Sequence, residues 1–237
     1  MIKYNSNTIN DWNFGDDNLV KVYYHDAVCY HKVGGSDTPR LPEGYTEVEY
    51  IENTGTTTSN GAFINTGVLL YDDANNTFTV TSRLKTQYYS ASADNTLQTF
   101  INSEGVSTPY NGFVYRYKYY TSGQEVELAG TGCNAELTTV DHEDGTRTVT
   151  IQSVSAATFT NQVPLGVFSS YNGNYSTPYR FSLMTLYSMK IVKNGTVVRD
   201  FVPAKRDSDS KFGLYDLITD MFYTSPNGKN FAGGNPV

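Results

Sequence analysis

The chain has 237 residues and a formal net charge of −7, with a pI near 4.9. Hydrophobic residues make up 38% of it and charged residues 17%, which allows one sizeable core and argues against a disordered, highly charged chain. Nucleic acid is bound mainly by clustered Lys and Arg, and the basic residues here are scattered, so we expect no nucleic-acid partner.

The N-terminus lacks the apolar stretch of a secretory signal, and no run approaches the roughly 18–20 apolar residues of a membrane-spanning helix. We therefore expect a protein that is neither exported by a cleaved signal nor held in a membrane. Cys29 and Cys133 lie far apart and form no CxxC pattern, which predicts neither a disulfide framework nor a zinc site. A single bridge between these two cysteines stays open as an alternative.

The N-terminal part is expected to form a small arm. Residues 19–24 and 27–33 are rich in β-branched and aromatic residues and are separated by His25 and Asp26, which predicts a β-hairpin. The Gly, Ser and Pro content of residues 35–40 predicts a linker. We therefore expect an arm over residues 1–34 and a main domain over residues 41–237.

An arm of about thirty residues buries too little surface to fold alone, so its apolar side chains must be covered. Either the main domain covers them, or sister chains or a larger assembly do so. The residues expected to make this contact are Trp12, Phe14, Val20, Val22, Tyr24, Val28 and Tyr30.

The main domain is expected to consist of strands, because apolar and polar residues alternate with a period of two from residue 43 onward. The apolar positions that share a face within each predicted strand are Phe78, Val80 and Leu84, then Val149 and Ile151, then Phe181, Leu183, Tyr187, Met189 and Ile191. No apolar stripe with helical spacing extends beyond about two turns.

Two turn motifs punctuate these strands. Asn194 and Gly195 stand between two alternating runs, which is typical of a type I′ hairpin. Asp144 and Gly145 predict a second hairpin, from residues 137–141 into 146–151. Many short strands joined by such turns indicate a sandwich or a barrel, and we expect an all-β two-sheet sandwich.

Segments near both ends of this domain resemble a known family. Residues 41–55 (LPEGYTEVEYIENTG) and 63–67 (FINTG) resemble the opening of concanavalin A-like lectin/glucanase domains of gut bacteria and their phages. Residues 186–203 (LYSMKIVKNGTVVRDFVP) and 213–223 (GLYDLITDMFY) resemble the closing strands of those domains. The resemblance implies a jelly-roll sandwich, and it implies fold better than function because the family has many roles.

A second resemblance concerns the arm. Residues 9–23 (INDWNFGDDNLVKVY) resemble the short leader shared by virion proteins of crAss-like Bacteroides phages. This resemblance implies an adaptor that attaches a variable domain to a phage particle. Such a particle assembles in the host cytoplasm, where no signal peptide is needed.

Residues 47–52 are the strongest candidate for catalysis. Glycosidases of this fold carry Glu-x-Asp-x-x-Glu on one strand, and Glu47, Glu49 and Glu52 have this spacing with a Glu in place of the Asp. The motif lies in the first strand of the domain instead of deep inside it, where Val48, Tyr50 and Ile51 indicate packing. We therefore expect no catalytic residues and no enzyme activity.

We also expect no cofactor and no metal site. The acidic segment 141–145 (DHEDG) lacks the spacing of an EF-hand and is typical of a solvated hairpin tip. Calcium held by loop carboxylates such as Asp72 and Asp73 stays open as an alternative, because lectin-like sandwiches often bind calcium in this way.

For binding, loop tyrosines beside amides are the candidates, because sugars stack their apolar C–H faces on aromatic rings and loops on a rigid sandwich often meet ligands. The predicted glycan-binding residues are Tyr110, Asn111, Tyr171, Asn172, Asn174 and Tyr175. The same loops could meet a neighbouring subunit instead.

These expectations combine into a non-catalytic phage virion structural protein, a head- or tail-associated fibre or decoration subunit that displays a lectin-like domain to host-surface or mucus glycans. The expected partners are sister subunits in a homo-oligomer and capsid or tail proteins, reached through the arm. The alternatives are a bacterial carbohydrate-binding module or adhesin outside a virion and, as a third reading, a glucanase, whether inactive or active.

Overall fold

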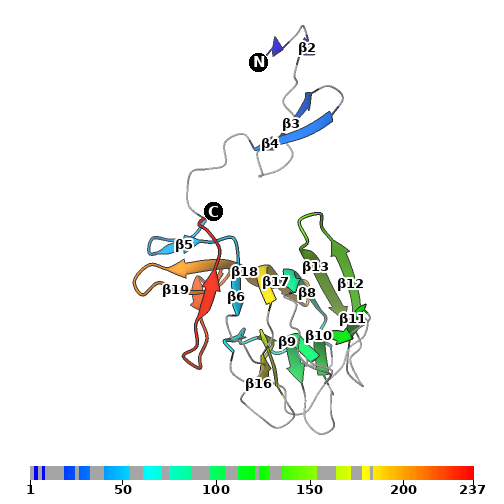
Figure 1. Ribbon diagram of the computed structural model, residues 1–237, viewed down its shortest axis with the longest axis vertical. Coiled ribbons are helices and arrows are strands. Elements are labelled where there is room, and N and C mark those ends of the chain that lie inside the picture. Colours follow the sequence, from blue (N-terminus) through cyan, green and yellow to red (C-terminus); the bar gives the residue numbers. More distant parts are fainter. Residues whose placement is uncertain are drawn as a thin grey trace. The chain divides into compact units, whose positions relative to one another are not determined.

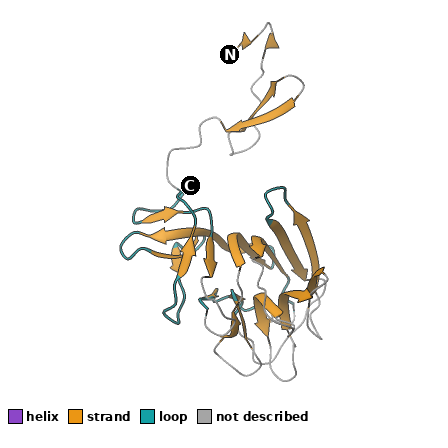
Figure 2. Cartoon of the chain, viewed as in Figure 1, coloured by secondary structure: helices purple, strands orange, loops and turns teal. Residues whose placement is uncertain are grey.

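The computed structural model describes residues 40–53, 61–70, 75–85, 135–153, 164–169, 181 and 184–237 with their side chains, and elsewhere the backbone of the strands given below. The chain divides into two compact units, Met1–Pro42 and Glu43–Val237. Strands and loops make up the described residues, and no helix occurs among them (Figure 2). The prediction of an all-β protein is confirmed.

The first unit contains four short strands, β1 (Lys3–Tyr4), β2 (Asn7–Thr8), β3 (Leu19–Tyr24) and β4 (Ala27–Lys32). Strands β3 and β4 pair antiparallel, with Val22 opposite Cys29 and Tyr24 opposite Ala27. The hairpin predicted in the arm is therefore confirmed.

The second unit contains two main sheets (Figure 1). The smaller, five-stranded sheet has the order β11 (Gly123–Leu128), β10 (Gly112–Tyr120), β9 (Leu97–Glu104), β14 (Gly166–Val167) and β7 (Ile64–Asn65). The larger, ten-stranded sheet has the order β12 (Ala135–Asp141), β13 (Arg147–Ser153), β8 (Phe78–Thr86), β17 (Met184–Lys193), β6 (Ile51–Asn53), β21 (Phe231–Gly233), β19 (Lys211–Asp216), β18 (Thr196–Arg206) and β5 (Tyr45–Glu47), with β20 (Met221–Tyr223) paired to β19. A separate hairpin joins β15 (Ser169–Tyr171) to β16 (Pro178–Phe181).

One part of the larger sheet closes on itself. Strand β17 pairs with β6 near its start and with β18 near its end. Strand β6 pairs with β21, β21 with β19, and β19 with β18, so five strands form a closed ring. A closed ring leaves none of these five strands as a free edge along its paired length.

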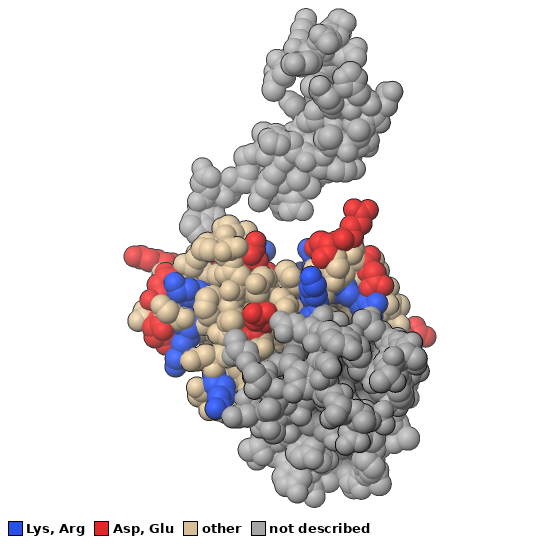
Figure 3. Space-filling view, in the orientation of Figure 1, with Lys and Arg blue, Asp and Glu red and all other residues tan. Residues whose placement is uncertain are grey.

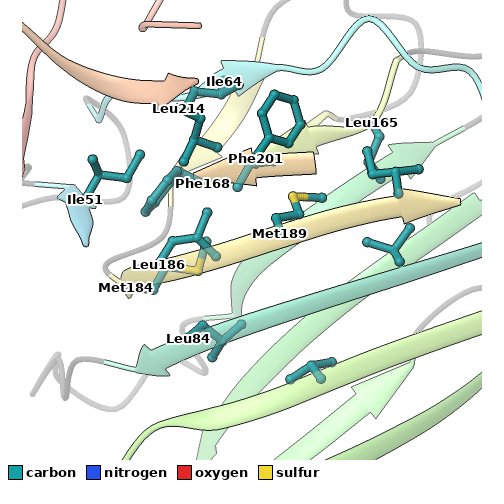
Figure 4. Close-up of a cluster of buried hydrophobic side chains, with 14 of the residues drawn as sticks. Ile51, Ile64, Leu84, Leu165, Phe168, Met184, Leu186, Met189, Phe201 and Leu214 are labelled. Atoms are coloured by element: carbon teal, nitrogen blue, oxygen red, sulfur yellow. The ribbon is translucent and has the colours of Figure 1, made fainter. Parts of the chain in front are cut away.

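The hydrophobic core joins both sheets (Figure 4). Ile64 and Val167 belong to the smaller sheet, whereas Leu84, Met189 and Phe201 belong to the larger one, and all five are fully buried or nearly so. In the described strands β8, β13 and β17, buried apolar residues such as Val80, Val149 and Ile191 point into this core, and most residues next to them are more exposed. The predicted two-sheet sandwich is confirmed.

Both predicted hairpins are present. Strands β17 and β18 meet at Asn194 and Gly195, which have φ angles of 50° and 75°, as a type I′ turn requires. The Asn194 amide stabilises this turn, because its Oδ1 accepts a hydrogen bond from the backbone N–H of Thr77 at 2.8 Å. Strands β12 and β13 form the second hairpin, with Gly145 at φ 76°.

The predicted face of residues 181–191 is wrong at Tyr187, and its member Leu183 lies outside the described residues. A β-bulge in β17 places Tyr187 as an extra residue between Leu186, which lies opposite Leu84, and Ser188, which lies opposite Arg83. An extra residue reverses the facing of all positions beyond it. Leu186 therefore shares the core face with Met189, and Tyr187 is half-buried on the outer side.

A buried carboxylate ties the ring together at the junction of β18, β19 and β20. The side chain of Asp216 is fully buried, and its Oδ1 accepts hydrogen bonds from the backbone N–H groups of Asp200 at 2.9 Å and Ile218 at 3.2 Å. Its Oδ2 accepts one from the Thr219 hydroxyl at 2.6 Å and lies 3.5 Å from Nε of Arg199. A buried charge is tolerated only when it is paired in this way.

Replacing this carboxylate should destabilise the second unit strongly. Asp216→Ala removes the charge partner of the largely buried Arg199 and the acceptor of two backbone N–H groups, which should cost about 3–5 kcal/mol in free energy of unfolding. Asp207→Ala is the matched control, since this exposed carboxylate accepts a hydrogen bond from the Thr46 hydroxyl and its loss should cost at most about 1 kcal/mol. Urea denaturation of the full chain measures both, and equal costs would contradict the assignment.

Candidate functional site

The outer face of the larger sheet carries two rows of side chains that cross the strands, and all of their members except Val140 are polar. Because Val149, Val80 and Met189 point into the core, their neighbours along β13, β8 and β17 face outward. The first row runs from Val140 through Thr148 and Arg83 to Ser188. The second row consists of Thr138, Thr150, Thr81, Lys190 and Asp200.

The bulge in β17 brings an aromatic pair to one end of this face. Tyr187 lies beside Tyr50, which precedes β6, with ring centroids 5.6 Å apart and an interplanar angle of 58°. The guanidinium of Arg83 lies over the Tyr187 ring, 5.7 Å from its centroid. We call Tyr50, Arg83, Asp144 and Tyr187 the tyrosine–arginine cluster.

Arg83 is held from two directions. Its Nη2 lies 2.5 Å from Oδ2 of Asp144, and its Nε donates a hydrogen bond to the Thr146 hydroxyl at 3.0 Å. Asp144 accepts two further hydrogen bonds on Oδ1, from the Thr146 hydroxyl at 2.6 Å and from its backbone N–H at 3.0 Å. The guanidinium plane is therefore fixed although its side chain is 44% exposed.

These hydrogen bonds determine the charge of the cluster. The Thr146 hydroxyl, the Thr146 backbone N–H and the Arg83 guanidinium lower the pKa of Asp144 to about 2. Burial raises the pKa of Tyr187, and the neighbouring Tyr50 adds to this effect. At neutral pH the cluster thus presents one carboxylate, one guanidinium and a protonated Tyr187 phenol. In Figure 3, carboxylates and basic groups stand side by side on the described surface.

The C-terminal segment supports Tyr50 from behind. The backbone N–H of Gly234 donates a hydrogen bond to the carbonyl of Tyr50 at 3.0 Å. A Cβ at Gly234 would lie 2.8 Å from Cε1 of Tyr50, so glycine is needed for this close approach. Glu49 accepts a hydrogen bond from the backbone N–H of Asn235 at 3.1 Å, which fixes the same strand pair.

The chemistry of the cluster suits a polyhydroxylated ligand. Tyr50 and Tyr187 are each partly exposed, so their rings offer apolar surface to C–H groups, and the Arg83–Asp144 pair offers donors and acceptors to hydroxyl groups. Such a combination of aromatic surface and a few fixed polar groups is typical of small-ligand sites.

The sequence-predicted binding residues are not placed by the structure. Outside the described residues lie Tyr110, Asn111, Asn172, Asn174, Tyr175, Trp12 and Phe14. Only the backbone is described for Tyr171 in β15, for Val20, Val22 and Tyr24 in β3, and for Val28 and Tyr30 in β4. Their proposed roles stay predictions.

The carboxylates considered for catalysis are divided between strands. Glu47 lies in β5 opposite Ala204, whereas Glu52 lies in β6 opposite Thr185. Val48 makes an isolated bridge to Pro236 between them, so the motif is not one continuous strand. In the glycosidase motif whose spacing these residues share, both carboxylates are carried by a single strand.

The described residues contain no arrangement typical of a metal site or of a membrane-spanning helix. Asp72 and Asp73 lie outside the described residues. Within the described part of the chain, no group of three or more His, Cys, Asp or Glu side chains is arranged to hold a metal ion. Among those same residues, none forms a helix with the length and apolar character needed to cross a lipid bilayer.

No protein-family model matches the chain, and no match was found among curated proteins or solved structures.

The protonation of Asp144 can be measured directly. Its carboxyl should titrate near pH 2 in carbon-detected NMR, below the ordinary value of 3.8. Thr146→Val removes the hydroxyl that contributes most to this shift and should raise the pKa toward the ordinary value. Because the folded-state pKa is depressed, the contribution of Asp144 to stability is present above about pH 4 and is lost as the pH falls toward 2. An unchanged midpoint in Thr146→Val would contradict the hydrogen-bond geometry.

Proposed function

We propose that this chain is a non-catalytic display protein whose second unit, Glu43–Val237, binds glycans at the tyrosine–arginine cluster. The observation that carries the proposal is the outward placement of Tyr187 by the β17 bulge, next to Tyr50 and under Arg83. Bulges are frequent beside functional sites, where they redirect a side chain. An aromatic pair beside an ordered arginine–carboxylate pair matches the needs of sugar recognition.

The absence of catalysis is supported by the positions of the candidate carboxylates. Hydrolysis of a glycosidic bond needs an acid and a base or nucleophile on either side of that bond. The Asp144 carboxylate, with a pKa of about 2, is a poor proton donor at neutral pH. The cluster is therefore proposed to hold its ligand without cleaving it.

The first unit is proposed to attach the chain to a larger particle. Its β3–β4 hairpin is a short two-stranded element, and such hairpins are marginal in water without a partner. The resemblance of residues 9–23 to a phage virion leader makes the surface of a bacteriophage particle the proposed setting. The chain would then be a head- or tail-associated fibre or decoration subunit, joined to sister subunits and to capsid or tail proteins through its arm.

Glycan-array binding tests the first part of this proposal. The full chain should bind a defined set of glycans, and Tyr187→Ala should weaken binding at least about tenfold, or roughly 1.4 kcal/mol. Arg83→Ala should also weaken it, whereas Arg206→Ala should not. Arg206 is the matched control because it likewise pairs with a carboxylate, Asp209 at 2.7 Å, and lies over an aromatic ring, Phe222 at 5.2 Å.

Other outcomes of this array are equally informative. Unchanged binding in Tyr187→Ala together with loss in Tyr171→Ala or Tyr175→Ala would move the site to the loops predicted from sequence. Release of reducing sugar from any bound glycan would show that the chain is an enzyme. Absence of binding to all glycans would remove the proposal.

Particle analysis tests the second part. If the chain is a virion subunit, antibodies raised against the second unit should label intact phage particles in electron micrographs. A chain that lacks residues 1–34 should be missing from particles while still binding glycans. Secretion by a bacterium and absence from particles would instead favour a carbohydrate-binding module or adhesin.

A further inference from the structure

A continuous row of polar side chains crosses the outer face next to the tyrosine–arginine cluster. Thr138, Thr150, Thr81, Lys190 and Asp200 lie opposite one another on β12, β13, β8, β17 and β18. We call these residues the polar row. Within it the hydroxyls of Thr81 and Thr150 are 3.3 Å apart, and Nζ of Lys190 lies 3.0 Å from Oδ2 of Asp200.

The polar row is continuous with the cluster. On β8, Arg83 lies two residues from Thr81 of the polar row. On the neighbouring strands, Arg83 lies opposite Thr148 of β13 and Ser188 of β17. Thr148 is two residues from Thr150, and Ser188 is two residues from Lys190, so the two rows are adjacent on all three strands. Residues two apart on a strand are separated by roughly 6.6–6.8 Å and face the same side. A ligand on the Tyr187 ring therefore reaches the polar row by extending a few ångströms across the sheet.

The length of the row exceeds a single sugar ring. Adjacent strands lie about 4.8 Å apart, so five strands span roughly 19 Å across their four intervals. The row is polar throughout and contains hydroxyls that both donate and accept hydrogen bonds. Hydroxyl partners at regular intervals suit a ligand that repeats hydroxyl groups at regular intervals.

Charge along this surface is balanced. Lys190 is paired with Asp200, and Arg83 is paired with Asp144. Paired cations offer donors to hydroxyl groups without a net positive field that would select an anionic sugar. The chemistry therefore fits a neutral glycan.

We propose that the polar row extends the site, so that the ligand is a neutral linear glycan lying across β17, β8 and β13. One sugar ring stacks on Tyr187 and Tyr50, and the following units hydrogen-bond to Thr81 and Thr150. This inference rests on the proposed glycan binding at the cluster and specifies its ligand class. It predicts that affinity grows with chain length.

Calorimetry on the full chain measures this growth. The probes are cello-, laminari-, xylo- and manno-oligosaccharides of one to six units. In at least one series the affinity should rise at least tenfold from disaccharide to tetrasaccharide. Affinity that stays level from the monosaccharide onward, or binding confined to anionic glycans on the array, would overturn the inference while leaving glycan binding intact. Absence of binding to every glycan would remove the proposed function and this inference with it.

Two variants locate the additional contacts. Thr81→Val and Thr150→Val remove one hydroxyl each at nearly constant volume and keep a β-branched residue in the strand. Each should lower tetrasaccharide affinity severalfold and leave disaccharide affinity unchanged. Thr46→Val is the matched control, because Thr46 lies in β5 and its hydroxyl donates to Asp207 instead.

The role of the polar row is tested by comparing the disaccharide and tetrasaccharide affinities of each variant. Unchanged tetrasaccharide affinity in both variants, with an unchanged melting temperature, would overturn the role of the polar row. Equal losses for disaccharide and tetrasaccharide would also overturn it, because both hydroxyls would then belong to the subsite at Tyr187.

Discussion

The second unit depends on one buried carboxylate. Asp216 accepts hydrogen bonds from the backbone N–H groups of Asp200 in β18 and Ile218 in the β19–β20 turn, and from the Thr219 hydroxyl. It also pairs with Arg199, whose Nε donates to the carbonyl of Thr66 at 3.1 Å. One side chain thus links β18, the β19–β20 turn and the segment that follows β7. Because the low-dielectric interior penalises any unpaired member, these contacts are expected to form or fail together. The positions of the outer-face side chains on β17 depend on this arrangement, because β18 pairs with the end of β17.

The bulge in β17 places Tyr187 in the tyrosine–arginine cluster. A regular β17 would bury this ring and turn Leu186 to solvent, so the bulge serves both the core and the outer face. Asp144 and Thr146 fix Arg83, whose guanidinium lies over the Tyr187 ring. Without the bulge, strict alternation would place this ring on the core side of the sheet, away from Arg83. The cluster is therefore a property of strand pairing, not of any single segment.

The features predicted correctly from the sequence are those that depend on residues close together in the chain. The Asn194–Gly195 and Asp144–Gly145 turns, the β3–β4 hairpin and the apolar faces of β8 and β13 follow from turn chemistry and period-two alternation. The cluster was missed because Tyr50 and Tyr187 lie far apart in sequence and because the bulge depends on partner strands. One sign was present: Leu186 and Met189 are three positions apart, where regular alternation spaces core residues by two. The burial of Asp216 depends equally on distant partners.

The position of β6 has a consequence for biosynthesis. This strand, made early, lies between β17 and β21, which are made late. The edge of β6 that pairs with β21 stays open on the ribosome until Phe231–Gly233 has emerged, so the ring cannot close before that point of translation. Contacts between residues so distant in sequence also slow folding, and an unpaired apolar strand is prone to association meanwhile. The protein would therefore benefit from a chaperone or from slow synthesis, and ribosome profiling with limited proteolysis of nascent chains would reveal a late, all-or-none gain of protease resistance.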